Sequence, residues 1–148
     1  MNWFSLGCYT IAVAIITGAF AAHGLDEPLA QLYAETPAKM QAGMEVSASW
    51  KYLQDFKTAA QYQVYCGVGL LALGLLPQTE KRTLRQFTGW MFLISVVLFS
   101  GSLYVLVLTG LTWLGAITPL GGLTMIAGWT TLGCLGWKSS ASQNATES

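Results

Sequence analysis

Four long apolar stretches, separated by more polar loops, dominate the pattern of this chain. They cover about residues 3–25, 59–76, 89–108 and 114–137, and none of them contains Asp, Glu, Lys or Arg. A helix rises ~1.5 Å per residue, so about 20 apolar residues cross the ~30 Å hydrocarbon core of a bilayer. The runs are continuous rather than alternating, which favours helices over the strands of a barrel. The pattern predicts an all-α membrane protein with four transmembrane helices in a bundle.

The segments around these stretches predict the rest of the organisation. Residues 1–138 are expected to form a single transmembrane domain, and residues 139–148 a disordered cytoplasmic tail. In the long first loop, 26–58, aromatic and apolar residues recur at helical spacing. This spacing predicts an interfacial helix over about 48–57 that runs into the second span. Pro119 cannot donate a backbone hydrogen bond, so we expect a kink or a new helix start beside it.

Composition agrees with a membrane protein that lies in the lipid bilayer. Charged residues make up 9% of the chain and apolar residues 53%, whereas a soluble domain typically has about 25% and about 45–50%. Seven basic and seven acidic residues give no net charge, so the chain has no basic excess of the kind that binds nucleic acid.

The distribution of basic residues predicts the orientation. The short second loop and the start of the tail carry Lys81, Arg82, Arg85 and Lys138, whereas the first loop carries three lysines. Lysine and arginine are enriched in cytoplasmic loops. We therefore expect a multi-pass protein of the cytoplasmic (inner) membrane, with its N- and C-termini and second loop in the cytoplasm.

Small residues at helical spacing predict close packing between helices. Ala14, Gly18 and Ala22 lie on one face of the first span, and Gly121 and Gly128 lie on one face of the fourth. Stripes of small residues let helix backbones approach closely in lipid. They indicate either contacts inside one bundle, which we favour, or a face that binds a second copy or a larger membrane protein.

Polar residues gather at the predicted outer ends of the spans. In lipid an unpaired amide or hydroxyl group is costly, so these side chains are expected to meet. They form either a hydrogen-bonded network that fixes the helix register or a polar pocket for a small ligand, proton or metal. The candidate cluster consists of His23, Gln61, Tyr62, Gln63, Tyr65, Cys66, Ser102, Tyr104 and Thr118.

The sequence offers no catalytic, cofactor or metal site. His23 is the only histidine, and the three cysteines have no C-x-x-C spacing, so a zinc ligand set is missing. Cys66 has no nearby cation in the sequence to favour its thiolate form. A serine nucleophile would need a base held by a third group, and none is evident. We expect that the protein is not an enzyme and binds no cofactor.

Four stretches together resemble a family of small bacterial inner-membrane proteins. They read GAFAAHGL (18–25), AAQYQVYCGVGLLALG (59–74), LFSGSLYVLVLTG (98–110) and LGAITPLGGLTMIAGW (114–129). The family is known as domain of unknown function 423, or uncharacterised protein family 0382, and its eukaryotic relatives are called transmembrane protein 256. The resemblance implies a four-helix integral membrane protein, and it brings no established activity, substrate or cofactor.

The chain departs from the family pattern at two positions. Ala21 stands where the first motif usually has a glycine, and Cys66 stands where the YQ-x-YH motif has a second histidine. The first loop is also longer than in compact members. The resemblance therefore gives no support here to a mechanism that needs two histidines.

Two functions remain open on the sequence. The first is a structural or accessory protein that packs against a membrane partner or against itself. The alternative is a minimal transporter or channel for a small solute that uses the outer polar cluster. Ion and proton pathways usually contain ionisable groups inside the membrane, and the four spans have no acidic or basic residue apart from His23. This favours the accessory function.

Overall fold

The computed structural model describes residues 1–77 and 82–146, with side chains through Gly136. Lys81 and the side chain of Lys138, on which the expected orientation partly depends, lie outside the described part. The long helical elements are α1 (Trp3–His23), α3 (Ala48–Leu75), α4 (Arg82–Ser95), the π-helix η1 (Val96–Gly101), α5 (Ser102–Thr109) and α6 (Thr118–Thr146). The short elements are α2 (Asp26–Leu32), β1 (Lys39–Gln41), β2 (Met44–Val46) and the 3-10 helix η2 (Thr112–Ala116).

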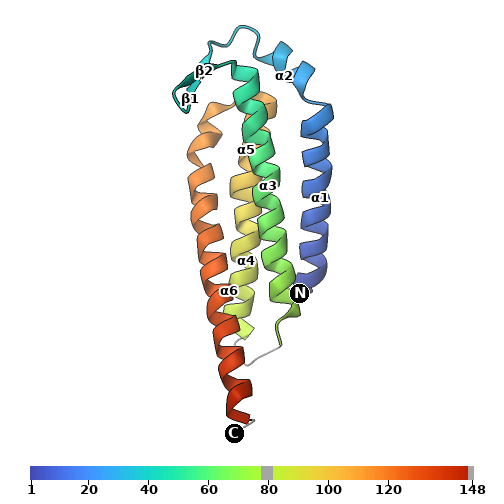
Figure 1. The fold of residues 1–148 in the computed structure, drawn as a ribbon, viewed down its shortest axis with the longest axis vertical. Coiled ribbons are helices and arrows are strands. Elements are labelled where there is room, and N and C mark those ends of the chain that lie inside the picture. The colour runs from blue at the N-terminus through green and yellow to red at the C-terminus, as the bar shows by residue number, and fades with distance from the viewer. Residues whose placement is uncertain (78–81, 147–148) are drawn as a thin grey trace.

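The long elements form a bundle of parallel and antiparallel rods (Figure 1). The segments α4, η1 and α5 follow one another without a break, so they make one rod. Helix α1 packs mainly on α3, and α4 packs mainly on α6, while α3 also contacts α4, η1 and α5. Both ends of the chain lie at one end of the bundle, and α2 with the β-hairpin covers the other end (Figure 1).

Each predicted span corresponds to a helical rod, but several boundaries differ. Helix α3 begins at Ala48, where the Ser47 side chain accepts a hydrogen bond from the Trp50 amide. No proline interrupts residues 48–75, so the expected interfacial helix over 48–57 is the first part of α3 rather than a separate element. Helix α6 begins at Thr118, next to Pro119, and its backbone stays helical through Thr146. The expected disordered tail thus differs from the structure, because no proline or glycine interrupts residues 137–146.

The β-hairpin in the first loop was not predicted. Its strands pair antiparallel, with Lys39 opposite Val46, and its turn has positive φ at Ala42 (49°) and Gly43 (81°). Two successive residues with positive φ are typical of the turns that match the twist of a hairpin. Strands of three residues are too short to give an alternating pattern that can be recognised in the sequence.

The first loop forms a packed cap on the bundle. Leu25 and Leu29 are buried, and the Tyr33 ring stacks on the Tyr52 ring with 4.2 Å between the centroids. The Tyr33 hydroxyl donates to the carbonyl of Val107 at 2.8 Å, which satisfies one of the last carbonyls of α5. Burial, followed by the neighbouring Tyr52, raises the pKa of the Tyr33 hydroxyl. The hydroxyl thus stays protonated and continues to donate.

Glycines let the rods approach to backbone contact. A Cβ placed on Gly7 of α1 would lie 2.7 Å from the Leu71 amide nitrogen, and one on Gly74 would lie 2.5 Å from the Phe4 amide nitrogen. In the centre of the bundle, the Phe92 ring lies against Gly69 of α3 and Gly128 of α6, where added Cβ atoms would come within 2.4 and 3.0 Å of it. These contacts explain how the paired helices pack at close distance.

The outer surface of the bundle is apolar. Two helical segments of the described chain are long and apolar enough to cross a bilayer: Trp3–His23 and Arg82–Thr109, with mean hydropathies of 1.8 and 2.4. Only 17% and 33% of their most apolar windows are buried inside the protein. The rest faces outward, including Ile16 (67% exposed) and Val97 (67% exposed), and α6 likewise exposes Ile126. A soluble protein would bury such helices, so this surface is that of a membrane protein.

Candidate functional site

A chain of hydrogen bonds crosses the interior of the bundle at Gln63. This side chain is buried on α3, and its Nε2 donates to the Thr10 carbonyl of α1 at 3.1 Å. The Tyr104 hydroxyl of α5 donates to Gln63 Oε1 at 3.0 Å. The Thr17 hydroxyl of α1 lies 3.0 Å from the Tyr104 hydroxyl. Every polar atom of the Gln63–Tyr104 pair thus has a protein partner, and the chain links three helices.

His23 does not join this network. It is the last residue of α1, its side chain is exposed, and it makes no hydrogen bond within the described part of the chain. It follows Thr17 by six residues, which places it about 9 Å further along the helix axis and rotates it by about 240°. The helix geometry therefore directs His23 away from the face that carries Thr17. We expected it to contact Gln63 or Tyr62, and the structure places it apart from both.

The other candidate residues lie in three places. Ser102 and Thr118 meet inside the bundle, where their hydroxyls lie 3.0 Å apart and join α5 to the start of α6. Gln61, Tyr62 and Tyr65 are exposed on the outer side of α3, where Gln61 Nε2 donates to the Tyr65 hydroxyl at 2.7 Å. Cys66 is fully buried among apolar side chains. The predicted cluster is therefore not one site.

Four of the five predicted packing residues contact other helices of the same bundle. Ala14 is buried, and a Cβ on Gly18 would lie 3.9 Å from the Ala60 Cβ of α3. A Cβ on Gly121 would lie 2.4 Å from the Phe99 amide nitrogen, and Gly128 faces Phe92. Ala22 is exposed instead. The face of α1 that contacts α3 drifts from Ala14 to Ala21, because a helix repeats every 3.6 residues rather than every four.

The π-helix η1 was not predicted, and three serines hold it in place. Ser95 Oγ donates to the Gly121 carbonyl and Ser100 Oγ donates to the Ala59 carbonyl, both at 2.8 Å. Ser102 Oγ donates to the Leu98 carbonyl at 2.6 Å within its own rod. A π-turn adds one residue to a helical turn and so rotates all following side chains. After this turn, Ser102 faces Thr118 of α6 and Tyr104 faces Gln63 of α3.

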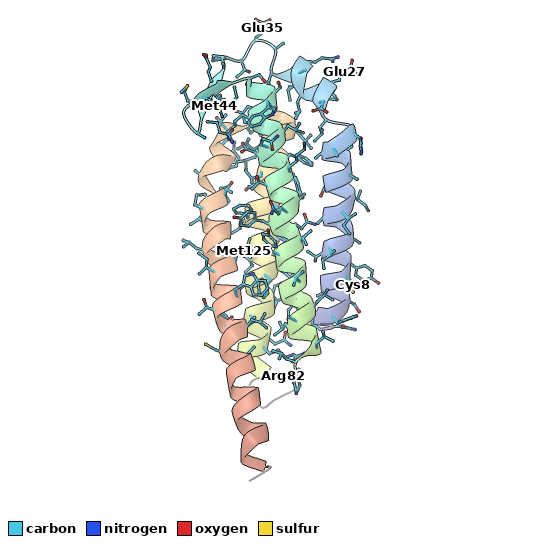
Figure 2. The ribbon with its side chains drawn as sticks, in the orientation of Figure 1. Cys8, Glu27, Glu35, Met44, Arg82 and Met125 are labelled. Carbon is cyan, nitrogen blue, oxygen red and sulfur yellow. The ribbon has the colours of Figure 1, made fainter. Side chains whose placement is uncertain are left out.

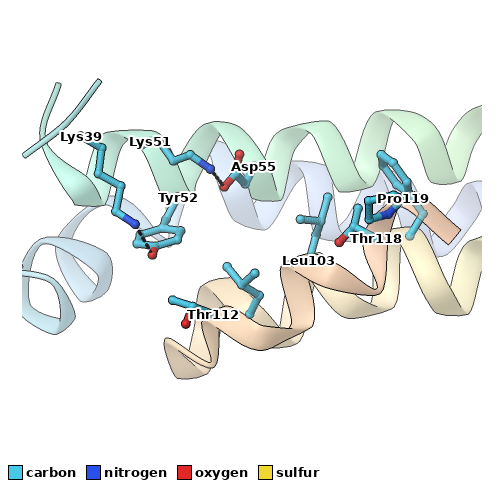
Figure 3. Close-up of a pocket in the computed structure, with 11 residues that line it drawn as sticks. Lys39, Lys51, Tyr52, Asp55, Leu103, Thr112, Thr118 and Pro119 are labelled. Atoms are coloured by element: carbon cyan, nitrogen blue, oxygen red, sulfur yellow. Dashed lines mark hydrogen bonds and ion pairs between the residues drawn. The ribbon is translucent and has the colours of Figure 1, made fainter. Parts of the chain in front are cut away.

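A cavity of about 450 Å³ lies at the capped end of the bundle, between α3 and the start of α6. Its polar side carries Lys39, Lys51, Tyr52 and Asp55 (Figure 3). Its apolar floor includes Phe99, Leu103 and Leu106, and its far wall includes Thr112, Thr118 and Pro119. Sequence reasoning did not identify it, because its residues come from six elements. Ligand sites typically range from ~300 to ~1,000 Å³.

Within the described residues, no group of three His, Cys, Asp or Glu side chains is placed to hold a metal ion. Cys8, Cys66 and Cys134 are free, and two of them are exposed. The candidate sites of this chain are thus a satisfied hydrogen-bond network and an open amphipathic cavity.

Replacing Gln63 with leucine tests the role of the network. The substitution removes both amide hydrogen bonds to neighbouring helices, each worth about 0.6–1.7 kcal/mol in membrane proteins. We expect Gln63→Leu to lower the unfolding free energy by about 1–3 kcal/mol, measured by SDS titration in mixed micelles. His23→Gln is the matched control and should unfold like the unmodified protein, because His23 is exposed. Equal losses in both variants would show that the network does not stabilise the bundle.

Comparison with known proteins gives one consistent family. A family model described as protein of unknown function (DUF423) matches residues 17–122. A UPF0382 membrane protein of Staphylococcus saprophyticus is 39% identical over 127 residues, which cover 86% of this chain and 89% of that protein. The UPF0382 membrane protein YwdK of Bacillus subtilis is 36% identical over 125 residues, which cover 84% and 86%. No solved structure matches significantly.

Proposed function

The chain belongs to the DUF423 family of proteins of unknown function, and from this premise we propose that it is a four-span protein of the cytoplasmic membrane with a structural or accessory role. Its relatives are named membrane proteins, and the outer surface of the bundle is apolar. In this role the protein stabilises or positions a membrane partner, or a second copy, and carries out no chemical reaction of its own.

The four-span arrangement is supported by helix lengths. Helix α1 has 21 residues and α3 has 28, which correspond to about 31 and about 42 Å. Both lengths reach across a hydrocarbon core of ~30 Å. The first turns of α3 therefore extend beyond the core, at the depth where Trp50 lies exposed. Tryptophan is enriched at this boundary.

The orientation follows from the basic residues at the two ends. Arg82 and Glu27 mark opposite ends of the bundle (Figure 2). Arg85 donates to the Leu76 carbonyl at 2.9 Å and so closes the end of α3. With the second loop in the cytoplasm, the cap formed by α2 and the hairpin faces outward. A reporter fused after Ser148 and one inserted in the first loop test this arrangement, because only the first should report the cytoplasm.

The observation that supports the accessory role is the hydrogen-bonded network around Gln63. Gln63, Tyr104 and Thr17 bond one another, and in the described part of α1, α3, α5 and α6 no carboxylate lies below the cap except Asp55. Transport pathways need polar groups that are free to bind the solute. These groups are instead committed to joining helices.

We assign the exposed side of helix α1 as the surface that contacts the proposed membrane partner. The helix packs mainly on α3 and meets α4 through Trp3 and α5 through Thr17, but only 17% of its most apolar window is buried. Ile15 and Ile16 are 62% and 67% exposed. A helix that is held on one side only offers its other faces to lipid or to another membrane helix.

A photo-reactive phenylalanine analogue at Ile16 tests this assignment, with the same analogue at Leu123 of α6 as the control. We expect a defined protein adduct, to a stoichiometric partner or to a second copy, at Ile16 and lipid adducts alone at Leu123. Solute flux through liposomes that contain only the purified protein would contradict the accessory role. It would support the alternative, a minimal transporter or channel, for which the cavity beside Asp55 is the supporting observation.

A further inference from the structure

The cavity between α3 and α6 combines an uncompensated positive charge with an apolar floor. Lys51 forms an ion pair with Asp55, which leaves Lys39 as the third charged side chain in the lining. Lys39 Nζ donates to the Tyr52 hydroxyl at 2.7 Å and lies 4.5 Å from the centroid of the Tyr52 ring. Both contacts are to a neutral group. The cavity therefore carries a net charge of +1.

The cluster of aromatic residues in the cap fixes the position of this lysine. Tyr52 stacks on Tyr33, and Tyr33 is anchored to the Val107 carbonyl of α5. Lys39 also stands on β1, which pairs with β2. The hairpin and the two rings thus hold the ammonium group at the cavity mouth. This restraint reduces the conformational entropy that the Lys39 side chain loses when a ligand binds.

The floor of the cavity is apolar, whereas its mouth carries the positive charge of Lys39. Phe99, Leu103 and Leu106 line it, and Phe99 belongs to the π-helix. The backbone of Phe99 also receives the close approach of Gly121. An occupant that satisfies both parts must have an anionic group at one end and hydrocarbon at the other. In the proposed four-span arrangement, the mouth lies at the level of the phospholipid phosphates.

We propose that this cavity binds one anionic phospholipid, with its phosphate at Lys39 and the upper part of an acyl chain against Leu103. The inference rests on the proposed membrane arrangement, because only there does the cavity open to a leaflet. An anionic lipid headgroup compensates the charge of Lys39, whereas a zwitterionic headgroup brings no net charge. A bound lipid would fill the gap that α3 and α6 leave at the capped end.

Native mass spectrometry of the full chain, with added phosphatidylglycerol or phosphatidylcholine, tests this proposal. We expect one retained phosphatidylglycerol and weaker binding of phosphatidylcholine. Lys39→Gln should weaken phosphatidylglycerol binding about fivefold, since a basic residue near an anionic lipid contributes about 1 kcal/mol. Lys57→Gln is the control, because Lys57 is an exposed lysine of α3 that does not line the cavity.

A second variant tests access to the cavity independently of charge. Thr112 is exposed on η2 at the rim, so Thr112→Trp should narrow the entrance, leave the fold intact and weaken the binding of both lipids. Equal binding of the two lipids, or equal loss in Lys39→Gln and Lys57→Gln, would overturn the proposal. So would a second copy of the chain crosslinked at Lys39 in place of lipid. The reporter fusions are read separately, so a failure of the four-span arrangement is distinguishable from a failure of lipid binding.

Discussion

Alanine at Gly7 is expected to loosen α1 from α3 and to destabilise the bundle by about 2–3 kcal/mol. The added Cβ would lie 2.7 Å from the Leu71 amide nitrogen and 2.8 Å from the Gly67 carbonyl oxygen. Both neighbours are backbone atoms in the middle of a helix, so neither can move without displacing α3. Because α1 has most of its contacts with α3, the strain falls mainly on this helix pair.

Gly122→Ala is the matched control for this prediction. It also adds one Cβ to a glycine in a helix, but nothing lies within 4 Å of the new atom. Replacing glycine by alanine in a helix is favourable by about 0.5–1 kcal/mol when no clash arises. SDS titration should therefore shift the two midpoints in opposite directions. Equal midpoints would mean that α1 and α3 separate easily and that the glycine contact carries no stability.

Phe92→Ala is expected to have the largest effect of a single truncation, about 3–5 kcal/mol. The Phe92 side chain is fully buried and lies in the centre of the bundle between α3 and α6. It also meets the Trp129 ring edge to face, with 5.4 Å between the centroids. Its removal leaves an apolar cavity that neither water nor lipid fills readily.

The glycine that faces this ring provides a sharper test. Gly69→Ala alone should destabilise the protein, because its Cβ would lie 2.4 Å from the Phe92 ring. In the Phe92→Ala background the same Cβ enters the vacated space, so the second substitution should cost little or restore stability. The expected coupling energy of the double-mutant cycle is about 1–3 kcal/mol. Additive effects would mean that ring and glycine do not contact each other.

The positions of the helical rods could be predicted from the sequence, but their exact lengths could not. Continuous apolar runs identify the rods, because a membrane helix is apolar on its outside as well as its inside. The start of α3 at Ala48 does not follow from the apolar run, since Lys51 and Asp55 make its first turns polar, and it was the helical spacing of aromatic and apolar residues that predicted a helix over about 48–57. Whether these polar turns continue the helix or form a loop depends on the cap residues that pack on Tyr52.

The candidate site was predicted in part. Gln63 and Tyr104, and Ser102 and Thr118, were placed in one polar set from their residue types, and each pair does meet. Thr17 was missed because a threonine in a helix usually bonds its own backbone, as it also does here to Ala14. The π-helix could not be predicted from the sequence, because no residue type requires it. Its extra residue rotates the side chains that follow it, which include Ser102 and Tyr104.

The pairing of helices has a consequence for biosynthesis. In the proposed four-span arrangement, α1 enters the bilayer before Ala48–Leu75 is synthesised, so Gly7 first faces lipid rather than protein. By length and composition α1 can cross a bilayer, with a mean hydropathy of 1.8. Helix α3 then completes one hairpin, and α4 and α6 complete a second, each with its closest contacts inside itself. In the proposed four-span arrangement, we therefore expect the protein to assemble as two hairpins in the order of translation.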